Sequence, residues 1–463
     1  MSESKVGAGP MWVLGLVIMI DQVDQNILRG IETPLRADRA LHVNDFKFGL
    51  LLASFVLVNG LLSVPAGYLA DRGNRTRTVG HTIVAWSGIS ALTAASPNFG
   101  VLLGVRSALG FGQAMAEPSC ASLLADYYPA EQRGLAFSIQ QCLVFAGIGL
   151  GVGVGGFVGN TFGWRWAFLL VGTPGVLIAL AMYRMREPRR GEGDRLHLGI
   201  AEAGTADADL RPALFDDGFG AFVRDMGKGL AADMRTIWGI PTMRYALVGV
   251  SSLLFSVTAL AAALPQFYER NLHVAKAAAP GYVGVVIVVG GIPGVLLGGR
   301  LADRWAPKIR GGRMALPAYC IMGGQVFLVA SYVMTHILPA IILEMLGAFV
   351  ITLAIPALRA GTSDALPANL RGAGFGAFNL ASVIFGQAAA STVVFSLATA
   401  FGHDLRTALL IVSPPAFLGG LIFLRARNHL DEDAAKIFAA IMTALAAQQA
   451  RDAARQAEAT GEG

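Results

Sequence analysis

Ionisable and amide side chains lie inside long apolar runs of this sequence, where they could bind a proton and a polar solute. Asp21 and Asp24 lie near the end of the first apolar run. Arg106, Gln113 and Glu117 lie in the fourth run at spacings of seven and four residues, so a continuous helix places them on one stripe. An arginine and an acid on one helix, facing an acid on another, predict a proton and substrate site.

The same residues also fit a fixed network of ion pairs that holds the first part of the chain together without binding a substrate. Asp24 in particular could cap a helix or pair structurally. Glu344, in an apolar run of the second half, is expected to face the cavity opposite Arg106. A position near the outer headgroups, with water as its partner, is the other interpretation of Glu344.

A second group of charged residues lies between apolar runs, and its patterns occur twice. The pattern Gly-x-x-x-Asp-Arg follows two runs, and the pattern Asp-x-x-Pro-x-x-x-Arg-Gly recurs with identical spacing. The first pattern and its flank supply these residues: Gly67, Asp71, Arg72, Arg75, Asp303 and Arg304. The second pattern supplies these: Asp126, Arg133, Asp364 and Arg371. Two patterns repeated in the same order predict two homologous halves.

We expect these repeated charges to form a cytoplasmic gate. They lie in short loops at one membrane face, where a compact and partly desolvated cluster can latch one helix end to another. A cluster that forms only when the cytoplasmic ends meet favours that state by its differential stability. The missing side chain of Gly67 allows its helix to pack closely on a neighbour.

The composition is that of a membrane protein. Of 463 residues, 54% are hydrophobic and 14% are charged, whereas a soluble chain carries about a quarter charged residues. Mean hydropathy is +0.56. Apolar segments of roughly 20 residues can cross a bilayer as helices, and the sequence has twelve such segments: 11–29, 49–70, 79–96, 100–124, 134–160, 163–184, 242–267, 281–303, 314–335, 338–363, 371–399 and 405–425. The expected fold class is all-α integral membrane, with twelve transmembrane helices in two pseudo-symmetric six-helix halves.

The charge distribution predicts the topology and the domain organisation. Basic residues gather in the loops of one face, which indicates a plasma (inner) membrane protein with both termini cytoplasmic. No cleavable signal peptide is expected before the first segment. The expected parts are an N-terminal half (1–185), a cytoplasmic linker with an amphipathic helix (186–240), a C-terminal half (241–427) and a partly helical cytoplasmic tail (428–463).

No sequence motif points to an enzyme. The zinc motif H-E-x-x-H, the nucleophile elbow and the P-loop are all missing. The three cysteines lie inside apolar runs without metal-ligand spacing, so no metal, cofactor or disulfide framework is expected. The expected partners are a small amphipathic substrate, protons and membrane lipids, with no nucleic acid, and the protein is expected to be a monomer.

The repeated Gly-x-x-x-Asp-Arg pattern resembles the sequence mark of the major facilitator superfamily, whose fold contains two parallel six-span repeats. Within that superfamily the chain resembles the Spinster group of lipid transporters. The likeness rests on Asp71-Arg72-Gly73-Asn74-Arg75, on the region from Ser122 to Ile139 and on Gly163-Trp164-Arg165-Trp166. It implies a secondary active or facilitative transporter of lysophospholipids or sphingoid lipids that works by alternating access, with proton coupling in some members.

Carried over by position, the resemblance implies that Asp24 and Arg106 are functional charges. The acid that the group has in span four falls on Gln113 here, and Glu117, one turn further on, is the expected substitute. The charged side of the cavity is then expected from the first half and the apolar side from the second half. That division suits a lipid with one polar head and one chain.

A drug/proton antiporter of the same superfamily is the alternative. Gly147, Gly151, Gly155 and Gly156 resemble the signature of such antiporters, but Val152 stands where that signature has proline. Close packing of helices explains a row of glycines at four-residue spacing equally well.

Overall fold

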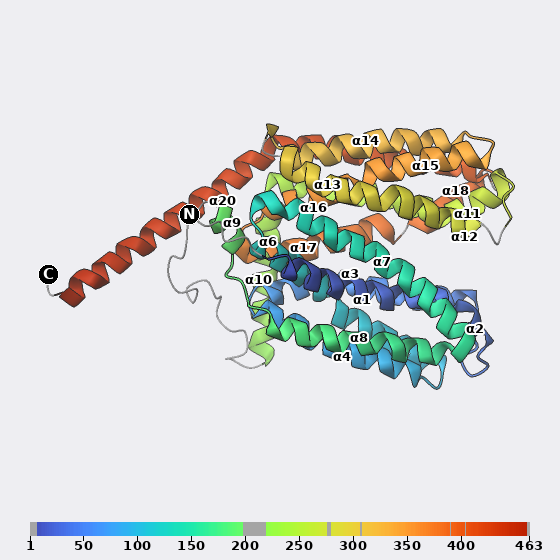
Figure 1. Ribbon diagram of the computed structural model, residues 1–463, viewed down its shortest axis with the longest axis horizontal. Coiled ribbons are helices and arrows are strands. Elements are labelled where there is room, and N and C mark those ends of the chain that lie inside the picture. Colours follow the sequence, from blue (N-terminus) through green and yellow to red (C-terminus); the bar gives the residue numbers. More distant parts are fainter. Residues whose placement is uncertain are drawn as a thin grey trace.

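The computed structural model describes residues 7–197, 219–275, 279–305, 308–388, 390–402 and 404–460. The regular elements within these ranges are all helices. They form two bundles that lie side by side, with the chain passing from the first bundle to the second after α8 (Trp164–Arg184) (Figure 1). The middle of the expected linker, 198–218, lies outside the described residues.

The first bundle, blue to green in Figure 1, is built from the N-terminal part of the chain. Asn44, Asn74 and Asn98 each begin a helix by accepting a hydrogen bond from a backbone N–H three residues later, which satisfies one of the free donors of a helix start. The helices before α8 are α1 (Gly9–Gly30), α2 (Glu32–Ala37), α3 (Asp45–Ala70), α4 (Arg75–Ala94), α5 (Phe99–Gln113), α6 (Ala116–Tyr127) and α7 (Ala130–Phe162).

The second bundle, yellow to red, follows two helices that lie between the bundles in the sequence, α9 (Glu192–His197) and α10 (Phe219–Gly239). Its elements are α11 (Pro241–Asn271), α12 (Ala279–Val285), η2 (Val286–Gly291), α13 (Ile292–Trp305), α14 (Gly312–Tyr332), α15 (Ile337–Thr352), α16 (Ala354–Asp364), η4 (Ala368–Leu370), α17 (Arg371–Leu380), η5 (Ala381–Gln387), α18 (Ala390–Ala400), α19 (Leu405–Val412) and α20 (Pro414–Thr460). Helix α20 leaves the bundle at the end where α9 lies (Figure 1). We call this the charged end.

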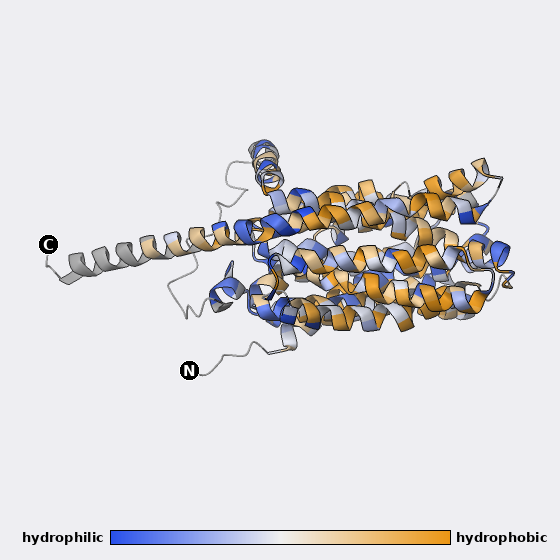
Figure 2. Cartoon of the chain, turned by 90° about the horizontal axis from the view of Figure 1, so that it is seen from above, coloured by the Kyte–Doolittle hydropathy of each residue, from blue (hydrophilic) through white to orange (hydrophobic). Residues whose placement is uncertain are grey.

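Eleven helices among the described residues are long and apolar enough to cross a membrane. Figure 2 shows hydrophobic residues along the length of the bundle and hydrophilic residues gathered toward its two ends. The segment expected at 79–96 forms α4, which is not among the eleven, and Arg75, Arg77 and His81 lower its apolarity. Helix α4 still takes a place in the bundle, because it packs along α8 and α5 and buries Ser90.

The contact between α1 and α7 depends on a row of glycines. A Cβ atom added at Gly151 would lie 2.6 Å from the carbonyl oxygen of Val23. Gly147 and Gly155 approach the α1 backbone in the same way, one turn to either side, whereas Gly153 faces open space. Glycine therefore allows the two helix backbones to touch. This contact accounts for the four-residue glycine spacing by packing alone.

We expect Gly151→Ala to destabilise the folded protein by about 1–3 kcal/mol, because overpacking a close contact costs about that much. Gly153→Ala is the matched control, and it should leave stability unchanged or raise it, since alanine has the higher helix propensity. Thermal unfolding of the purified protein, followed by circular dichroism, measures both variants. Equal melting temperatures would show that the α1–α7 contact tolerates a methyl group.

Candidate functional site

Asp71 ties the first half to the second half at the charged end. Its two carboxylate oxygens accept hydrogen bonds from the backbone N–H groups of Gly372 and Ala373, both at 2.9 Å. These groups belong to the first turn of α17, where free N–H groups and the helix dipole favour an anion. Gly67 makes the approach possible, because a Cβ atom there would lie 2.1 Å from the carbonyl oxygen of Gly372.

Asp303 makes the reciprocal contact from the second half to the first. Its oxygens accept from the backbone N–H groups of Gly134 and Leu135, at 2.8 and 2.9 Å, near the N-terminal end of α7. The backbones of Gly134 and Gly299 touch beside this contact. Gly67 and Gly372 touch in the same way beside Asp71. The two copies of the repeated sequence pattern therefore make the same contact in opposite directions.

Two arginines, one from each half, pair with an acid of the other half. Arg133 donates to Asp364 at 2.8 Å, and Arg371 donates to Asp126 at 2.6 Å. Each of these acids also binds an arginine of its own half. Asp126 binds Arg75, and Asp364 binds Arg313. Alternating charges from both halves thus form one connected cluster across the charged end.

The linker supplies an acid that the repeated patterns do not contain. Asp194 of α9 binds both Arg133 and Arg371 through its two carboxylate oxygens. Burial raises the pKa of this carboxyl, but the two guanidinium groups outweigh burial and lower the pKa to about 2. The ion pairs are therefore complete above about pH 4 and are lost only as the pH falls toward 2.

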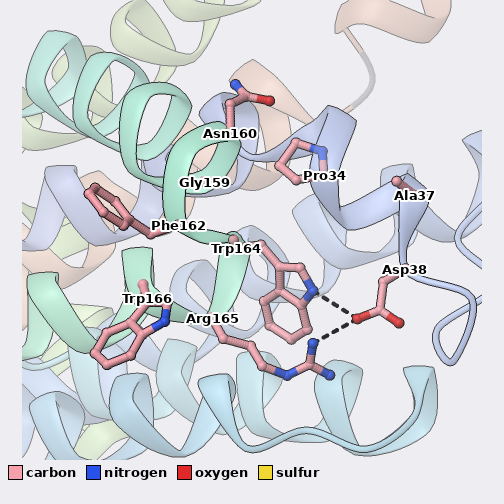
Figure 3. A pocket seen from close by; sticks show the side chains of 10 residues that line it. Pro34, Ala37, Asp38, Gly159, Asn160, Phe162, Trp164, Arg165 and Trp166 are labelled. Carbon is pink, nitrogen blue, oxygen red and sulfur yellow. Dashed lines mark hydrogen bonds and ion pairs between the residues drawn. The ribbon is translucent and has the colours of Figure 1, made fainter.

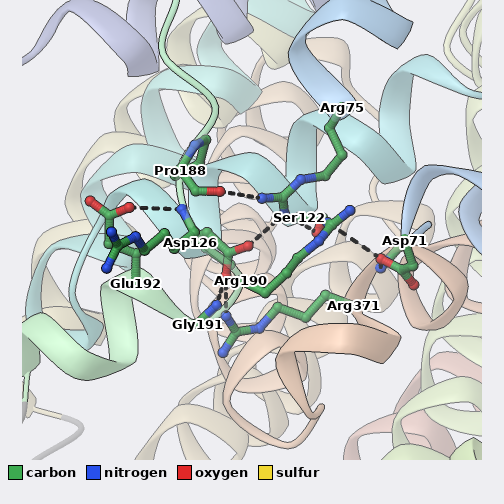
Figure 4. Close-up of polar contacts among 12 residues, drawn as sticks. Asp71, Arg75, Ser122, Asp126, Pro188, Arg190, Gly191, Glu192 and Arg371 are labelled. Atoms are coloured by element: carbon green, nitrogen blue, oxygen red, sulfur yellow. Dashed lines mark hydrogen bonds and ion pairs between the residues drawn. The ribbon is translucent and has the colours of Figure 1, made fainter. Parts of the chain in front are cut away.

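The residues just before Asp194 hold the linker against the first half. The backbone N–H of Gly191 donates to Asp126 at 3.0 Å (Figure 4). Arg190 donates to the carbonyl oxygen of Ala70 at 2.8 Å. Gly193 has no room for a side chain, because a Cβ atom would lie 2.5 Å from the carbonyl oxygen of Ala125. Since this segment is short and polar, only its charges distinguish it in the sequence.

Among the residues that the structure describes, no ion pair connects Arg72 or Arg304 with an acid of the charge cluster. The guanidinium of Arg72 lies 3.3 Å from the centre of the Tyr68 ring, and it is 3.7 Å from Asp233 of α10. Arg304 is exposed at the end of α13. The expectation that these two arginines belong to the gate therefore differs from the structure. In the first copy, Asp71 and Arg72 therefore contact different neighbours, although they are adjacent in the chain.

The acid and the arginine expected at the substrate site are packed inside the first bundle. Asp24 accepts hydrogen bonds from Ser90 at 2.6 Å, from Gln113 at 3.2 Å and from Arg106 at 3.4 Å. Asp24, Arg106 and Gln113 are each at most 1% exposed. The three side chains are therefore shielded from solutes in this arrangement, and their expected part in substrate binding stays a prediction. Their contacts with one another match the ion-pair network that was the other interpretation.

In span four, Arg106 and Glu117 have different partners, although Ala114 and Met115 between α5 and α6 keep right-handed helical dihedral angles. Helix α5 ends at Gln113 and α6 begins at Ala116, with a turn between them. Glu117, in the first turn of α6, binds the second half rather than Arg106. Its carboxylate lies 2.6 Å from the guanidinium of Arg359 on α16.

Sequence reasoning missed Arg359. The signal was present, because a lone arginine in the apolar run 338–363 is costly and calls for a partner. Asp21, by contrast, was expected at the site and lies buried on α1, where Gln25 donates to one carboxylate oxygen at 2.7 Å. Its other oxygen has no partner among the described residues.

Glu344 lies apart from Arg106. It is fully buried in the second bundle and accepts hydrogen bonds from the hydroxyl groups of Tyr268 and Ser331. No cation pairs with it among the described residues. Neither of the two expected positions, opposite Arg106 or in water near the headgroups, matches this enclosed site.

Hydrogen bonds between the two bundles extend from the charged end only part of the way along the molecule, among the described residues. Asn379 donates to Asn59 at 3.2 Å. Ser63 donates to the carbonyl oxygen of Gly376 at 2.9 Å, nearer to the charged end. Among the described residues, the hydrogen bonds that join the bundles reach no further from the charged end than the Asn59 pair. The structure is therefore closed at the charged end.

A surface pocket of about 480 Å³ lies at the opposite end of the first bundle, between α2 and the turn from α7 to α8 (Figure 3). Asp38 accepts there from the indole N–H of Trp164 at 3.0 Å and from Arg165 at 2.8 Å. The indole, together with Arg165, lowers the pKa of Asp38. All its lining residues come from the first bundle, so this pocket is separate from the contact between the halves.

Comparison with known proteins agrees with this architecture. The family model described as Major Facilitator Superfamily matches residues 14–391. The probable L-galactonate transporter of Escherichia coli (strain K12) is 24% identical over 424 residues, which cover 89% of this chain and 88% of that protein. Protein spinster homolog 1 of Mus musculus is 29% identical over 187 residues, which cover 40% of this chain but only 35% of that relative.

A solved structure extends the likeness to the whole fold. It is a bacterial homolog to the human lysosomal transporter Spinster, in an inward-facing and occupied conformation. The TM-score is 0.57 at 18% sequence identity, and the match covers 91% of this chain and 97% of that chain. At this identity the likeness concerns the arrangement of the helices.

We expect Asp194→Asn to favour opening of the charged end, because an amide forms weaker hydrogen bonds with two arginines than a carboxylate does. Hydrogen bonds to charged groups contribute about 1.5–3 kcal/mol each, so the open population should rise about tenfold. The distance between spin labels at the exposed positions of Arg77 and Lys308, one on each half, reports the opening.

Glu432→Gln is the control for the Asp194 variant. Glu432 pairs with Arg310 at 3.8 Å, and both side chains are more than half exposed, so the loss of this pair should leave the distance distribution unchanged. The role of Asp194 is refuted if its variant and the control give the same distribution.

Proposed function

The chain belongs to the major facilitator superfamily, and on that premise we propose what it carries and how its two halves move. It is a multi-pass membrane protein and a secondary transporter. We propose that its substrate is an amphipathic lipid, a lysophospholipid or a sphingoid lipid, and that it works by alternating access. We further propose that it lies in the plasma (inner) membrane, with the charged end and both termini in the cytoplasm.

The closed charged end supports alternating access. Asp71 and Asp303 hold the halves together by accepting hydrogen bonds from backbone N–H groups near the start of a helix in the other half. Opening this end must break both contacts and separate the arginine pairs of Asp126 and Asp364. A cluster that exists in one state alone shifts the equilibrium toward that state. The reciprocal pairs therefore act as the gate that favours closure on the cytoplasmic side.

One observation supports the lipid proposal above the others. Where the two halves meet, a charged pair lies next to apolar side chains. Glu117 and Arg359 form the charged pair. Three residues before Gln140, which contacts Arg359, the halves meet through the rings of Phe137 and Phe375, whose centres are 6.0 Å apart. A molecule with one polar head and one chain matches this contrast. The likeness of 40% of this chain to spinster homolog 1 supports the same substrate class.

A small organic acid is the second candidate substrate. The relative with L-galactonate in its name matches along 89% of this chain, and galactonate carries a carboxylate that an arginine such as Arg359 can bind. The drug/proton antiporter has less support. The glycines that resemble its signature, Gly151 among them, are explained by their contact with α1.

Uptake into proteoliposomes tests the proposed substrate. The panel contains a lysophospholipid, a sphingoid base, L-galactonate and a cationic drug, each with and without a pH gradient. We expect saturable uptake of the lysophospholipid or the sphingoid base, and none of galactonate or the drug. Uptake of galactonate alone would replace the lipid proposal by the second candidate. Lipid uptake that ignores the pH gradient would indicate a facilitator.

The gate predicts a steric variant that blocks closure. We expect Gly67→Ala to slow lipid uptake about tenfold, because its methyl group would lie 2.1 Å from the carbonyl oxygen of Gly372 and overpacking costs about 1–3 kcal/mol. Gly73→Ala, in the loop that follows α3, is the control. Its nearest contact is 3.7 Å from Thr78, which is ordinary contact distance, so uptake should stay at the wild-type rate. Equal rates for the two variants would contradict closure through the α3–α17 contact.

A further inference from the structure

One ion pair joins the two halves away from the charged cluster. Glu117 lies nine residues before Asp126 in the first half, and Arg359 lies five residues before Asp364 in the second. Helical rise puts the pair roughly 8–14 Å further into the membrane than the gate acids. The pair therefore lies between the gate and the part of the molecule where the described hydrogen bonds between the halves end.

Arg359 differs from the arginines of the gate because the side chain of its acidic partner is more exposed to solvent. Arg133 and Arg371 each bind two acids, and those acids are at most 17% exposed. Arg359 binds one acid among the described residues, Glu117, whose side chain is 38% exposed, while its own side chain is 16% exposed. A solute can reach this pair, whereas the gate pairs are shielded.

A second polar group beside Arg359 lacks a partner. Gln140 of α7 accepts a hydrogen bond from Arg359 at 3.4 Å through its side-chain oxygen. Its amide nitrogen is buried and has no hydrogen-bond partner among the described residues. Buried polar groups are nearly always paired, so a free donor next to a guanidinium indicates a place for an additional acceptor.

We propose that Arg359 binds the anionic group of the transported solute, a carboxylate or a phosphate, and that Glu117 is the internal carboxylate which the solute displaces. Gln140 donates the second hydrogen bond to that anion. A guanidinium binds both carboxylate and phosphate in a two-pronged manner. Because Glu117 is partly exposed, it is solvated after it leaves, so its displacement costs less than breaking a buried pair. This assignment rests on the proposed transport function and deepens it.

The exchange couples occupancy to the contact between the halves. The Glu117–Arg359 pair connects α6 to α16. When a solute anion replaces Glu117, the first half keeps only the weaker Gln140 contact to that arginine. Binding therefore removes one connection between the halves and lowers the free energy needed to separate them.

Calorimetric titration of the full chain in lipid nanodiscs tests the assignment. The probes are dodecyl phosphate, dodecanoate, dodecyltrimethylammonium and gluconate. Arg359→Gln should weaken binding of the two anionic amphiphiles at least tenfold, and Arg359→Lys should restore part of the affinity. Glu117→Gln should strengthen their binding about tenfold, because the internal competitor has lost its charge. None of these variants should change the affinity for dodecyltrimethylammonium in the direction in which it changes the affinity for the anionic amphiphiles.

Glu432→Gln, which alters an exposed pair far from the site, is the control and should match wild type. The assignment is overturned if Arg359→Gln binds the anions within twofold of wild type, or if wild type binds none of them. If gluconate binds in an Arg359-dependent manner and the anionic amphiphiles do not, the anion site stands and the lipid proposal fails. If the anionic amphiphiles bind independently of Arg359, the lipid proposal stands and the anion site fails.

Discussion

A charge buried in a membrane protein needs a partner, and in this chain the partner of a gate residue often lies in the other half. Asp71 and Asp303 reach the backbone of the opposite half, and Arg133 and Arg371 reach its acids. Separating the halves leaves each of these groups without its partner until water replaces it. The stability of the closed end and the route to opening it therefore depend on the same few contacts.

Repetition in the sequence identified most of the gate but not its connections. Equal spacing in the two copies singled out Asp126 and Asp364, yet a sequence does not show that each pairs with an arginine from the other copy. Asp194 could not be found in this way, because the linker occurs once and has no counterpart. The fold class was predictable for a simpler reason, since long apolar runs have few stable structures other than helices in a membrane.

The membrane acids show where helical periodicity misleads. Helical spacing grouped Glu117 with Arg106, but Arg106 binds Asp24 of its own half while Glu117 binds Arg359 of the other half. Asp24 and Arg106 were correctly expected to lie close together, while their burial depends on the packing of α1, α4 and α5, which no single segment contains. Arg359 was visible as a charge in an apolar run, but its partner lies more than two hundred residues away in the chain.

Helix α20 runs without interruption from the second bundle to Thr460. Asp433 on this helix accepts hydrogen bonds from the backbone and side chain of Thr242, at the start of α11. The helix beyond Asp433 is roughly 40 Å long at about 1.5 Å per residue. Because this helix continues from the second bundle, a tilt of that bundle by about 5° would move the end of the helix by roughly 3–4 Å. A fluorophore at that end would thus register rocking of the second half from outside the bilayer.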